Sequence, residues 1–137
     1  MSAPGPVGVP DRDGGLHLYL HDVNDGTIVV LAGDLDLATA PRLARAVEQL
    51  PDDPRPVILD LRDVVFVDSS GVSALLDVER VLGEKRRSLA LLQPAGAVTR
   101  VLDLVELRSR FYELDRLDPD ALSELTRPPR GGPRASP

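Results

Sequence analysis

Short apolar segments of the chain alternate with segments of helical periodicity, and this alternation constrains the fold more than any other feature. Apolar, strand-like runs occupy residues 27–33, 57–61 and 88–92. After the first two runs, apolar residues recur three or four positions apart, at Leu43, Val47 and Leu50 and then at Val72, Leu75, Val78 and Leu82. Strands separated by helices need crossover connections, so the sequence predicts a mainly parallel sheet covered by helices.

The pattern extends at both ends. Residues 16–20 alternate as in a half-buried strand, and the turn residues at 24–26 predict a hairpin with 27–33. Residues 96–107 carry a third helical set, a short RFYEL segment follows at 110–114, and residues 118–125 can form a last helix. The third helical set is Val98, Val101, Leu102 and Val105. We therefore expect an α/β fold with a central, mostly parallel sheet of four to five strands, an N-terminal hairpin and three to four helices.

The chain has room for one domain with a single core. It has 137 residues, of which 42% are hydrophobic. Residues 1–15 and 126–137 are rich in proline and glycine and cannot bury apolar surface, so we expect two flexible tails around a domain at 16–125. The second tail contains Arg127, Arg130 and Arg134 without an acid, which suits either a solvated tail or a basic contact arm.

Charge and cysteine content exclude several classes of function. The net charge of -6 argues against direct binding to nucleic acid or to an anionic membrane surface and favours a basic partner. Without cysteine, disulfides, thiolate catalysis and cysteine-based zinc sites are excluded. No run approaches the roughly 18 apolar residues of a membrane span, and the N-terminus lacks the features of a secretory signal. We expect a cytoplasmic protein without a membrane association.

The segment Asp68-Ser69-Ser70-Gly71 lies between an apolar run and the second helical pattern, so it forms the start of that helix. Aspartate and serine cap helices by accepting hydrogen bonds from free backbone N–H groups, and this role alone explains their presence. A phosphate on one of the hydroxyls would also be stabilised there by N–H donors and the helix dipole. The residues themselves leave capping alone and capping with regulation as two open interpretations.

Three segments in this order and spacing resemble the family of anti-sigma-factor antagonists, also called STAS domains. They are GDLDLATA at 33–40, VILDLRDVVFVDSSGVSALL at 57–76 and LALLQPAGAVTRVLDLVEL at 89–107. The resemblance implies a protein that, when unphosphorylated, binds an anti-sigma factor that is also a serine kinase and so frees a sigma factor. Phosphorylation ends the binding, and a protein phosphatase would reverse it. The family's acceptor position falls on Ser69, with Ser70 as the neighbouring cap.

The resemblance also implies a partner-binding surface. Asp36 matches a family acid near the phosphorylation loop, although a turn or helix-cap role explains it equally well. Thr39 is first of all a predicted cap at the start of the first helix, and Asp68 would orient the serine, contact the partner or simply cap. The full predicted set is Asp36, Thr39, Asp68, Ser69, Ser70, Gly71 and Val72. The chain departs from the family at Ser73 and Glu106, where members commonly have glycine.

Enzymatic alternatives have weaker support in the sequence. No G-x-S-x-G elbow, P-loop or dinucleotide fingerprint occurs, and His17 and His21 fit ordinary positions near the first strand. Asp60, Asp63 and Asp68 suggest a Mg²⁺ or phosphoaspartate site, but Asp60 falls in a predicted strand and Asp63 in a predicted turn. We expect no catalytic activity, metal or cofactor. The alternative to an antagonist is a STAS scaffold subunit of a lipid-transport or sensory assembly, with the serine motif as a cap only.

Overall fold

The computed structural model describes residues 15–92 and 96–117 of the chain. These residues form one five-stranded sheet in the order β1-β2-β3-β4-β5. The strands are β1 (Leu16–Val23), β2 (Gly26–Leu35), β3 (Val57–Val67), β4 (Leu89–Leu92) and β5 (Tyr112–Leu114). β1 and β2 form an antiparallel hairpin, and each later strand is parallel to its neighbour. The predicted hairpin and parallel sheet are both confirmed, while residues 1–14 of the first predicted tail, the second tail and the last helix at 118–125 lie outside the described residues.

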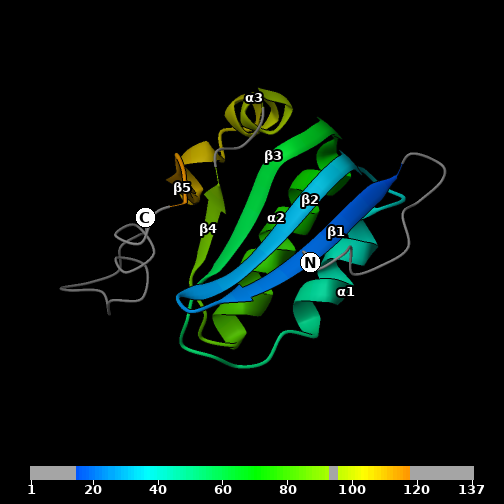
Figure 1. Ribbon diagram of the computed structural model, residues 1–137. Coiled ribbons are helices and arrows are strands. Elements are labelled where there is room, and N and C mark those ends of the chain that lie inside the picture. Colours follow the sequence, from blue (N-terminus) through cyan, green and yellow to red (C-terminus); the bar gives the residue numbers. More distant parts are fainter. Residues whose placement is uncertain (1–14, 93–95, 118–137) are drawn as a thin grey trace.

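Three α-helices connect the described strands: α1 (Ala40–Glu48), α2 (Ser69–Glu84) and α3 (Gly96–Leu104), with a short 3₁₀ turn, η1 (Arg108–Arg110), before β5. Figure 1 shows α1 and α2 on one face of the sheet and α3 beside the last part of β3. Every apolar residue that the helical spacing of α1 and α2 singled out is buried. In α3, Val98 and Leu102 are buried, whereas Val105 falls after the helix and is exposed.

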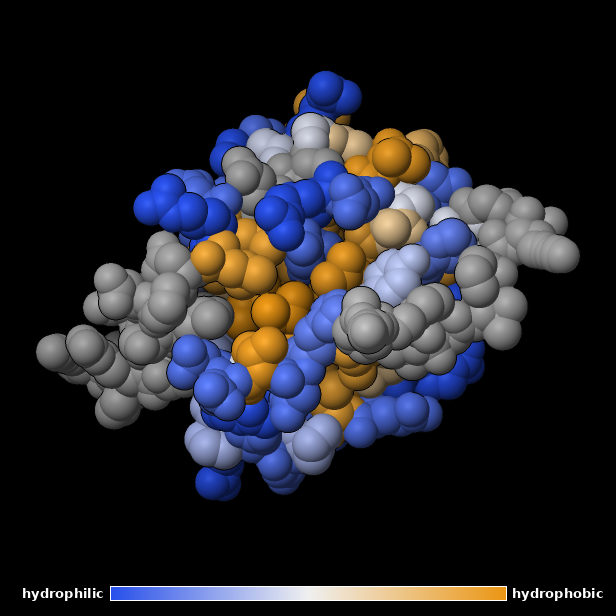
Figure 2. Space-filling model, in the orientation of Figure 1, coloured by the Kyte–Doolittle hydropathy of each residue, from blue (hydrophilic) through white to orange (hydrophobic). Residues whose placement is uncertain are grey.

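The main core lies between the sheet and the helices. Alternate residues of the central strands point into it, with Val29 and Leu31 from β2 and Leu59 and Leu61 from β3 at most 1% exposed. The intervening residues form a smaller buried cluster on the opposite face, made up of Ile28, Ile58, Ala90, Leu92 and Leu114. Figure 2 shows hydrophobic residues gathered near the middle of this second face, between hydrophilic side chains. Burial on both faces explains why the central strands are continuous apolar runs rather than alternating ones.

β3 is longer than the sequence predicted and carries two irregularities. Its pairing with β2 advances from Val30↔Asp60 to Ala32↔Asp63, so two steps along β2 match three along β3. A second shift lies between the pairs of Gly33 and Asp34, where one step along β2 spans two along β3, from Val64 to Phe66. Each shift adds one residue to β3, as in a β-bulge. Asp63 therefore lies within the strand, and its predicted place in a turn is wrong.

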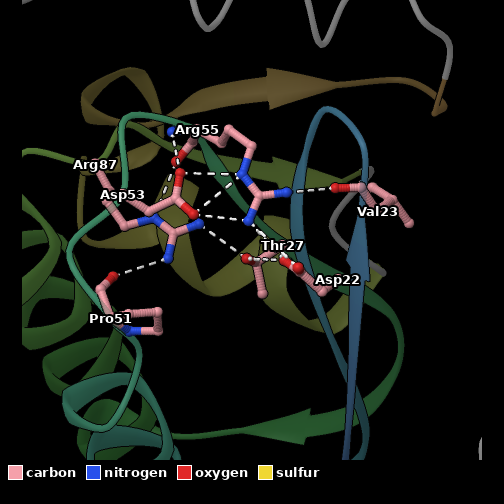
Figure 3. A network of polar contacts seen from close by, with 7 residues as sticks. All are labelled: Asp22, Val23, Thr27, Pro51, Asp53, Arg55 and Arg87. Atoms are coloured by element: carbon pink, nitrogen blue, oxygen red, sulfur yellow. Dashed lines mark hydrogen bonds and ion pairs between the residues drawn. The ribbon is translucent and has the colours of Figure 1, made fainter.

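A polar network closes the end of the sheet where the hairpin turns (Figure 3). The Arg87 side chain, 4% exposed, donates to the backbone oxygens of Arg55 (2.9 Å) and Pro51 (3.1 Å) and to the Thr27 hydroxyl (2.8 Å). Thr27 in turn donates to the Asp22 carboxylate at 3.0 Å. Arg87 thereby ties the loop before β4 to the loop before β3 and to the start of β2. Its burial lowers the pKa of the guanidinium.

Arg55 completes this network from the solvent side. Its guanidinium pairs with Asp53 at 2.7 Å and with Asp22 at 3.0 Å, and it donates to the Val23 carbonyl at 2.6 Å. The hydrogen bond with Asp53 raises the pKa of Arg55, and the same bond holds the pKa of the Asp53 carboxyl well below its usual range. The hairpin turn and the loop between α1 and β3 are therefore joined by side chains as well as by the sheet.

Candidate functional site

The serine motif forms the junction between β3 and α2. Asp68 is the N-cap residue of α2, with an extended backbone (φ -120°, ψ -169°), and its carboxylate accepts a hydrogen bond from Gly71 N at 3.1 Å. Its backbone oxygen accepts the first helical bond, from Val72 N at 3.1 Å. The cap function therefore belongs to Asp68, and the prediction that Ser70 is the cap is wrong. An aspartate at this position satisfies a free N–H and complements the helix dipole.

Because Asp68 supplies the cap, the Ser69 side chain is not needed to hold α2 in place within the described residues. Ser69 is the first residue of α2, its side chain is exposed, and no described residue hydrogen-bonds its hydroxyl. The backbone N–H groups of the first helical turn have no partner within the helix, apart from the one that Asp68 binds. Ser69 thus presents a free hydroxyl next to backbone donors at the positive end of a helix dipole.

Gly71 and Val72 hold the first turn of α2 tightly against the end of β2. A Cβ atom on Gly71 would overlap the Leu35 carbonyl and lie 2.6 Å from a methyl carbon of Val67, so only glycine fits there. Val72 is 7% exposed and packs in the main core. Gly71 and Val72 belong to the predicted partner-binding set, but both are buried. They support the turn of Asp68 and Ser69 from the core side and do not face solvent.

The neighbouring turn, between β2 and α1, is organised by Asp36. Its carboxylate accepts hydrogen bonds from Ala38 N and Thr39 N, each at 3.1 Å. Thr39 occupies the N-cap position of α1, but its hydroxyl does not cap the helix. Instead it donates to the Asp34 carbonyl at 2.7 Å and accepts from Asp36 N at 2.9 Å. The predicted turn role of Asp36 agrees with this geometry. Thr39 lies at the predicted cap position, but its hydroxyl does not make the capping hydrogen bond.

The two turns lie side by side at one end of the sheet. Leu35 and Val67, the last residues of β2 and β3, are register partners, and Asp68 N donates to the Leu35 carbonyl at 3.3 Å. In Figure 1 the arrowheads of β2 and β3 meet at this end, away from the hairpin. Parallel pairing thereby brings the turn of Asp36 next to the turn of Asp68 and Ser69. Of the predicted set, Asp36, Asp68, Ser69 and Ser70 are the members that are at least partly exposed.

Sequence reasoning did not single out three exposed apolar residues at the same end. Leu37, Val65 and Phe66 are 75%, 72% and 49% exposed. Val65 is the residue that the second shift of register adds to β3, so two successive side chains reach solvent where a regular strand would bury one of them. The run VVFV before the motif lacks the alternation of a half-buried strand. This is the only feature of the sequence that indicates exposed apolar residues here.

The enzymatic alternatives find no support in the described residues. Asp60 is 5% exposed, and Arg62 binds its carboxylate through Nε at 3.0 Å and Nη2 at 2.8 Å. This hydrogen bond raises the pKa of Arg62. The Asp60 carboxylate therefore forms an ion pair with Arg62. Within residues 15–92 and 96–117, no group of three or more potential ligands could hold a metal ion. His17 and His21 lie in β1 and are half-buried.

Two further features of the described residues bear on function. A shallow surface hollow is lined by Asp103, Glu106, Arg108, Ser109, Phe111 and Glu113, none of which belongs to the two turns. Arg108 within it is already paired with Glu113 at 3.1 Å and with Asp103 at 3.4 Å, and the first of these bonds raises its pKa. None of the helices in the described part is long and apolar enough to cross a membrane. The Ser69 end of the sheet is thus the candidate site.

Comparisons with known proteins define the class of protein. The family model for the STAS domain matches residues 20–120, so the chain belongs to the STAS domain family. The fold is shared with a crystal structure of an anti-sigma factor antagonist from Mycobacterium paratuberculosis, with 25% sequence identity and a TM-score of 0.71. That match covers 87% of this chain and 100% of the other. No curated protein matches the sequence.

Three other solved structures show the same fold at lower identity. The anti-sigma factor antagonist SpoIIAA in its unphosphorylated form is 21% identical, with a TM-score of 0.62 over 78% of this chain and 94% of that one. The Bacillus SpoIIAA structure in the phosphorylated form is 22% identical, with a TM-score of 0.54 and coverage of 78% and 97%. A sulfate transporter family protein from Wolinella succinogenes is 21% identical, with a TM-score of 0.61 and coverage of 72% and 82%.

Proposed function

We propose that this chain is an anti-sigma-factor antagonist that works in the cytoplasm and is switched off by phosphorylation of Ser69. In its unphosphorylated form it binds a serine-kinase anti-sigma factor and thereby frees a sigma factor for transcription, and a protein phosphatase restores it. The observation that carries this proposal is the exposed Ser69 hydroxyl at the start of α2, which needs no partner because Asp68 caps the helix. Similarity to the antagonist from Mycobacterium paratuberculosis supports the same reading.

The surroundings of Ser69 suit a switch by added charge. A phosphate brings about -1.5 to -2 charges at pH 7 and would lie next to Asp68 and close to the Asp36 turn. Within the protein, backbone N–H groups and the helix dipole can stabilise that charge. In an interface that fits a neutral hydroxyl, the same charge is buried without a partner, at a cost of about 3–5 kcal/mol. Affinity for the anti-sigma factor should therefore fall by about a hundredfold or more.

The test uses the purified chain, its serine-kinase anti-sigma factor and ATP. One phosphate should be added, located on Ser69 by mass spectrometry, and Ser69→Ala should remove it. In calorimetric titration, Ser69→Ala should bind persistently with ATP present and Ser69→Glu should bind poorly while remaining folded. Ser88→Glu, an exposed serine after α2, is the matched control and should bind like wild type. A phosphate on Ser70 or Ser88, or equal affinity of the Ser69 variants, would contradict the proposal.

The second candidate function is a STAS scaffold subunit of a lipid-transport or sensory assembly. It is favoured by the cap itself, because Asp68 gives the motif a complete structural role without phosphorylation. The fold shared with a sulfate transporter family protein also supports this alternative. In this case no kinase would phosphorylate the chain, and all Ser69 variants would bind the same assembly equally.

A further inference from the structure

The Ser69 end of the sheet carries more exposed apolar surface than a turn requires. Leu37, Val65 and Phe66, which we call the apolar rim, are 75%, 72% and 49% exposed. They lie close together, because Leu37 follows Leu35 by two residues, Phe66 precedes Val67 by one, and Leu35 and Val67 are register partners. Ser69 follows Val67 by two residues, so the acceptor hydroxyl and the rim occupy the same end of the sheet.

The rim depends on a specific irregularity of β3. The register shift after Val64 inserts Val65, so Val65 and Phe66 are both exposed while Val64 and Val67 on either side are 2% and 6% exposed. Bulges of this kind redirect side chains and are common beside functional sites. A scattered exposed apolar residue needs no explanation, but a bulge that exposes two in succession next to a third favours contact with another surface.

Two acidic residues of the sheet lie near the rim. Asp34 is the register partner of Phe66, and Asp63 precedes Val65 by two residues. Neither carboxylate receives a hydrogen bond from a described residue, whereas Asp36 and Asp68 are both used in their own turns. Arg62, the cation within β3 at this end, is already bound by Asp60. On the β2 and β3 side, the rim therefore has two carboxylates as neighbours.

We propose that the apolar rim is the anchor by which the serine-kinase anti-sigma factor docks before it reaches Ser69. The inference rests on the proposed function and adds the chemistry of the partner: an apolar patch bordered by arginine or lysine side chains. An apolar centre contributes most of the affinity of an interface, and a complementary charged border raises the association rate. Docking at the rim places the kinase beside the first residue of α2.

The experiment compares substitutions in the apolar rim with a control substitution at Leu104, which is as exposed as Leu37. Leu37→Ser and Phe66→Ser should weaken binding of the purified kinase at least about tenfold and raise the KM for Ser69 phosphorylation by a similar factor. Leu104→Ser is the matched control, because Leu104 is also 75% exposed but lies at the end of α3. The control should bind and be phosphorylated like wild type. Circular dichroism and urea unfolding establish that every variant is folded.

The charged border has its own readout. Asp34→Asn with Asp63→Asn should slow association of the kinase about three- to tenfold at low salt and reduce its salt dependence, with little change in dissociation. Normal binding and phosphorylation of Leu37→Ser and Phe66→Ser, or an equal loss in Leu104→Ser, would overturn the rim as the anchor while leaving the switch at Ser69 intact. If the kinase neither binds nor modifies the wild type, the proposed function fails, and the rim proposal fails with it.

Discussion

At the scale of single residues, the two helix ends before β4 and β5 contain a strained backbone conformation. Arg86 and Glu106 both have φ of 60°, in the left-handed region that favours glycine. The following residues close the helices with bonds from Arg87 N to the Leu82 carbonyl (2.8 Å) and from Leu107 N to the Leu102 carbonyl (2.9 Å). These are Schellman ends with a non-glycine residue in the position where glycine is usual. The departure noticed at Glu106 in the sequence therefore has a conformational consequence.

Replacing Glu106 by glycine should stabilise the protein. The left-handed conformation costs a residue with a Cβ about 1–2 kcal/mol, and the greater freedom of glycine in the unfolded chain offsets about 0.5–1 kcal/mol of this. Urea unfolding of Glu106→Gly should show a net gain of about 0.5–1 kcal/mol. Glu106→Gln keeps the backbone strain and removes only the charge, so it should change stability little. An equal gain for both variants would mean that charge, not conformation, is the cause.

The cap of α2 gives a second test on single residues. Asp68→Ala removes the acceptor of Gly71 N and should cost about 1 kcal/mol of unfolding free energy. Ser70→Ala should change it by less than about 0.5 kcal/mol, because Ser70 does not cap the helix. Thermal or urea unfolding of the two variants side by side measures the difference. The opposite ranking would return the cap to Ser70.

At the scale of elements, the loops at the hairpin end are held by Arg87. Arg87→Met leaves the Pro51 and Arg55 carbonyls and the Thr27 hydroxyl without this donor, and each buried polar group left unpaired costs about 1–3 kcal/mol. We expect a loss of about 2–4 kcal/mol in urea unfolding. Arg80→Met, on the exposed face of α2 and paired with Glu84 at 3.2 Å, is the control and should cost less than about 0.5 kcal/mol. Similar losses in both would exclude a special role for Arg87.

The same network predicts a dependence on pH. The hydrogen bond from Arg55 lowers the pKa of Asp53 in the folded protein below its ordinary value of 3.8. A lowered folded pKa gives stability that is present above the unfolded pKa and is lost as the pH falls. Unfolding free energy should therefore decline as the pH is lowered below about 4, and Asp53→Asn should show a shallower decline. Parallel curves for the two proteins would contradict the assignment.

Whether the sequence could predict a feature of these elements depended on the kind of pattern that the feature leaves in the sequence. Apolar spacing found the buried faces of α1 and α2, because burial selects residue type directly. The continuation of β3 through Asp63 was missed, because the polar pair Arg62-Asp63 resembles a turn and only the pairing with β2 reveals the inserted residues. The serine motif was placed at the correct helix end, but which side chain caps depends on backbone angles that residue type does not fix. The Arg87 network joins residues distant in sequence and left no local pattern.

At the scale of the whole molecule, the sheet separates two ends with different properties. One end contains the two turns, Ser69 and the exposed rim, while the other contains the network of Arg55 and Arg87 (Figures 1 and 3). The core between them is continuous from β2 through α2, with Leu31, Leu59 and Leu75 fully buried. Changes in charge at the Ser69 end should therefore remain local, because the packed core and the network hold the remaining elements in place.

Phosphorylation of Ser69 should accordingly leave the fold intact. The phosphate meets backbone donors and the helix dipole on one side and the carboxylate of Asp68 on the other, so the two effects partly cancel and the unfolding free energy should change by about 1 kcal/mol or less. Hydrogen exchange should change at residues 34–38 and 68–72 and remain constant at 51–56 and 85–88. Ser69→Ala treated with kinase and ATP is the control without phosphate. Loss of cooperative unfolding, or altered exchange at the hairpin end, would show that the switch acts by reshaping the domain rather than through its surface.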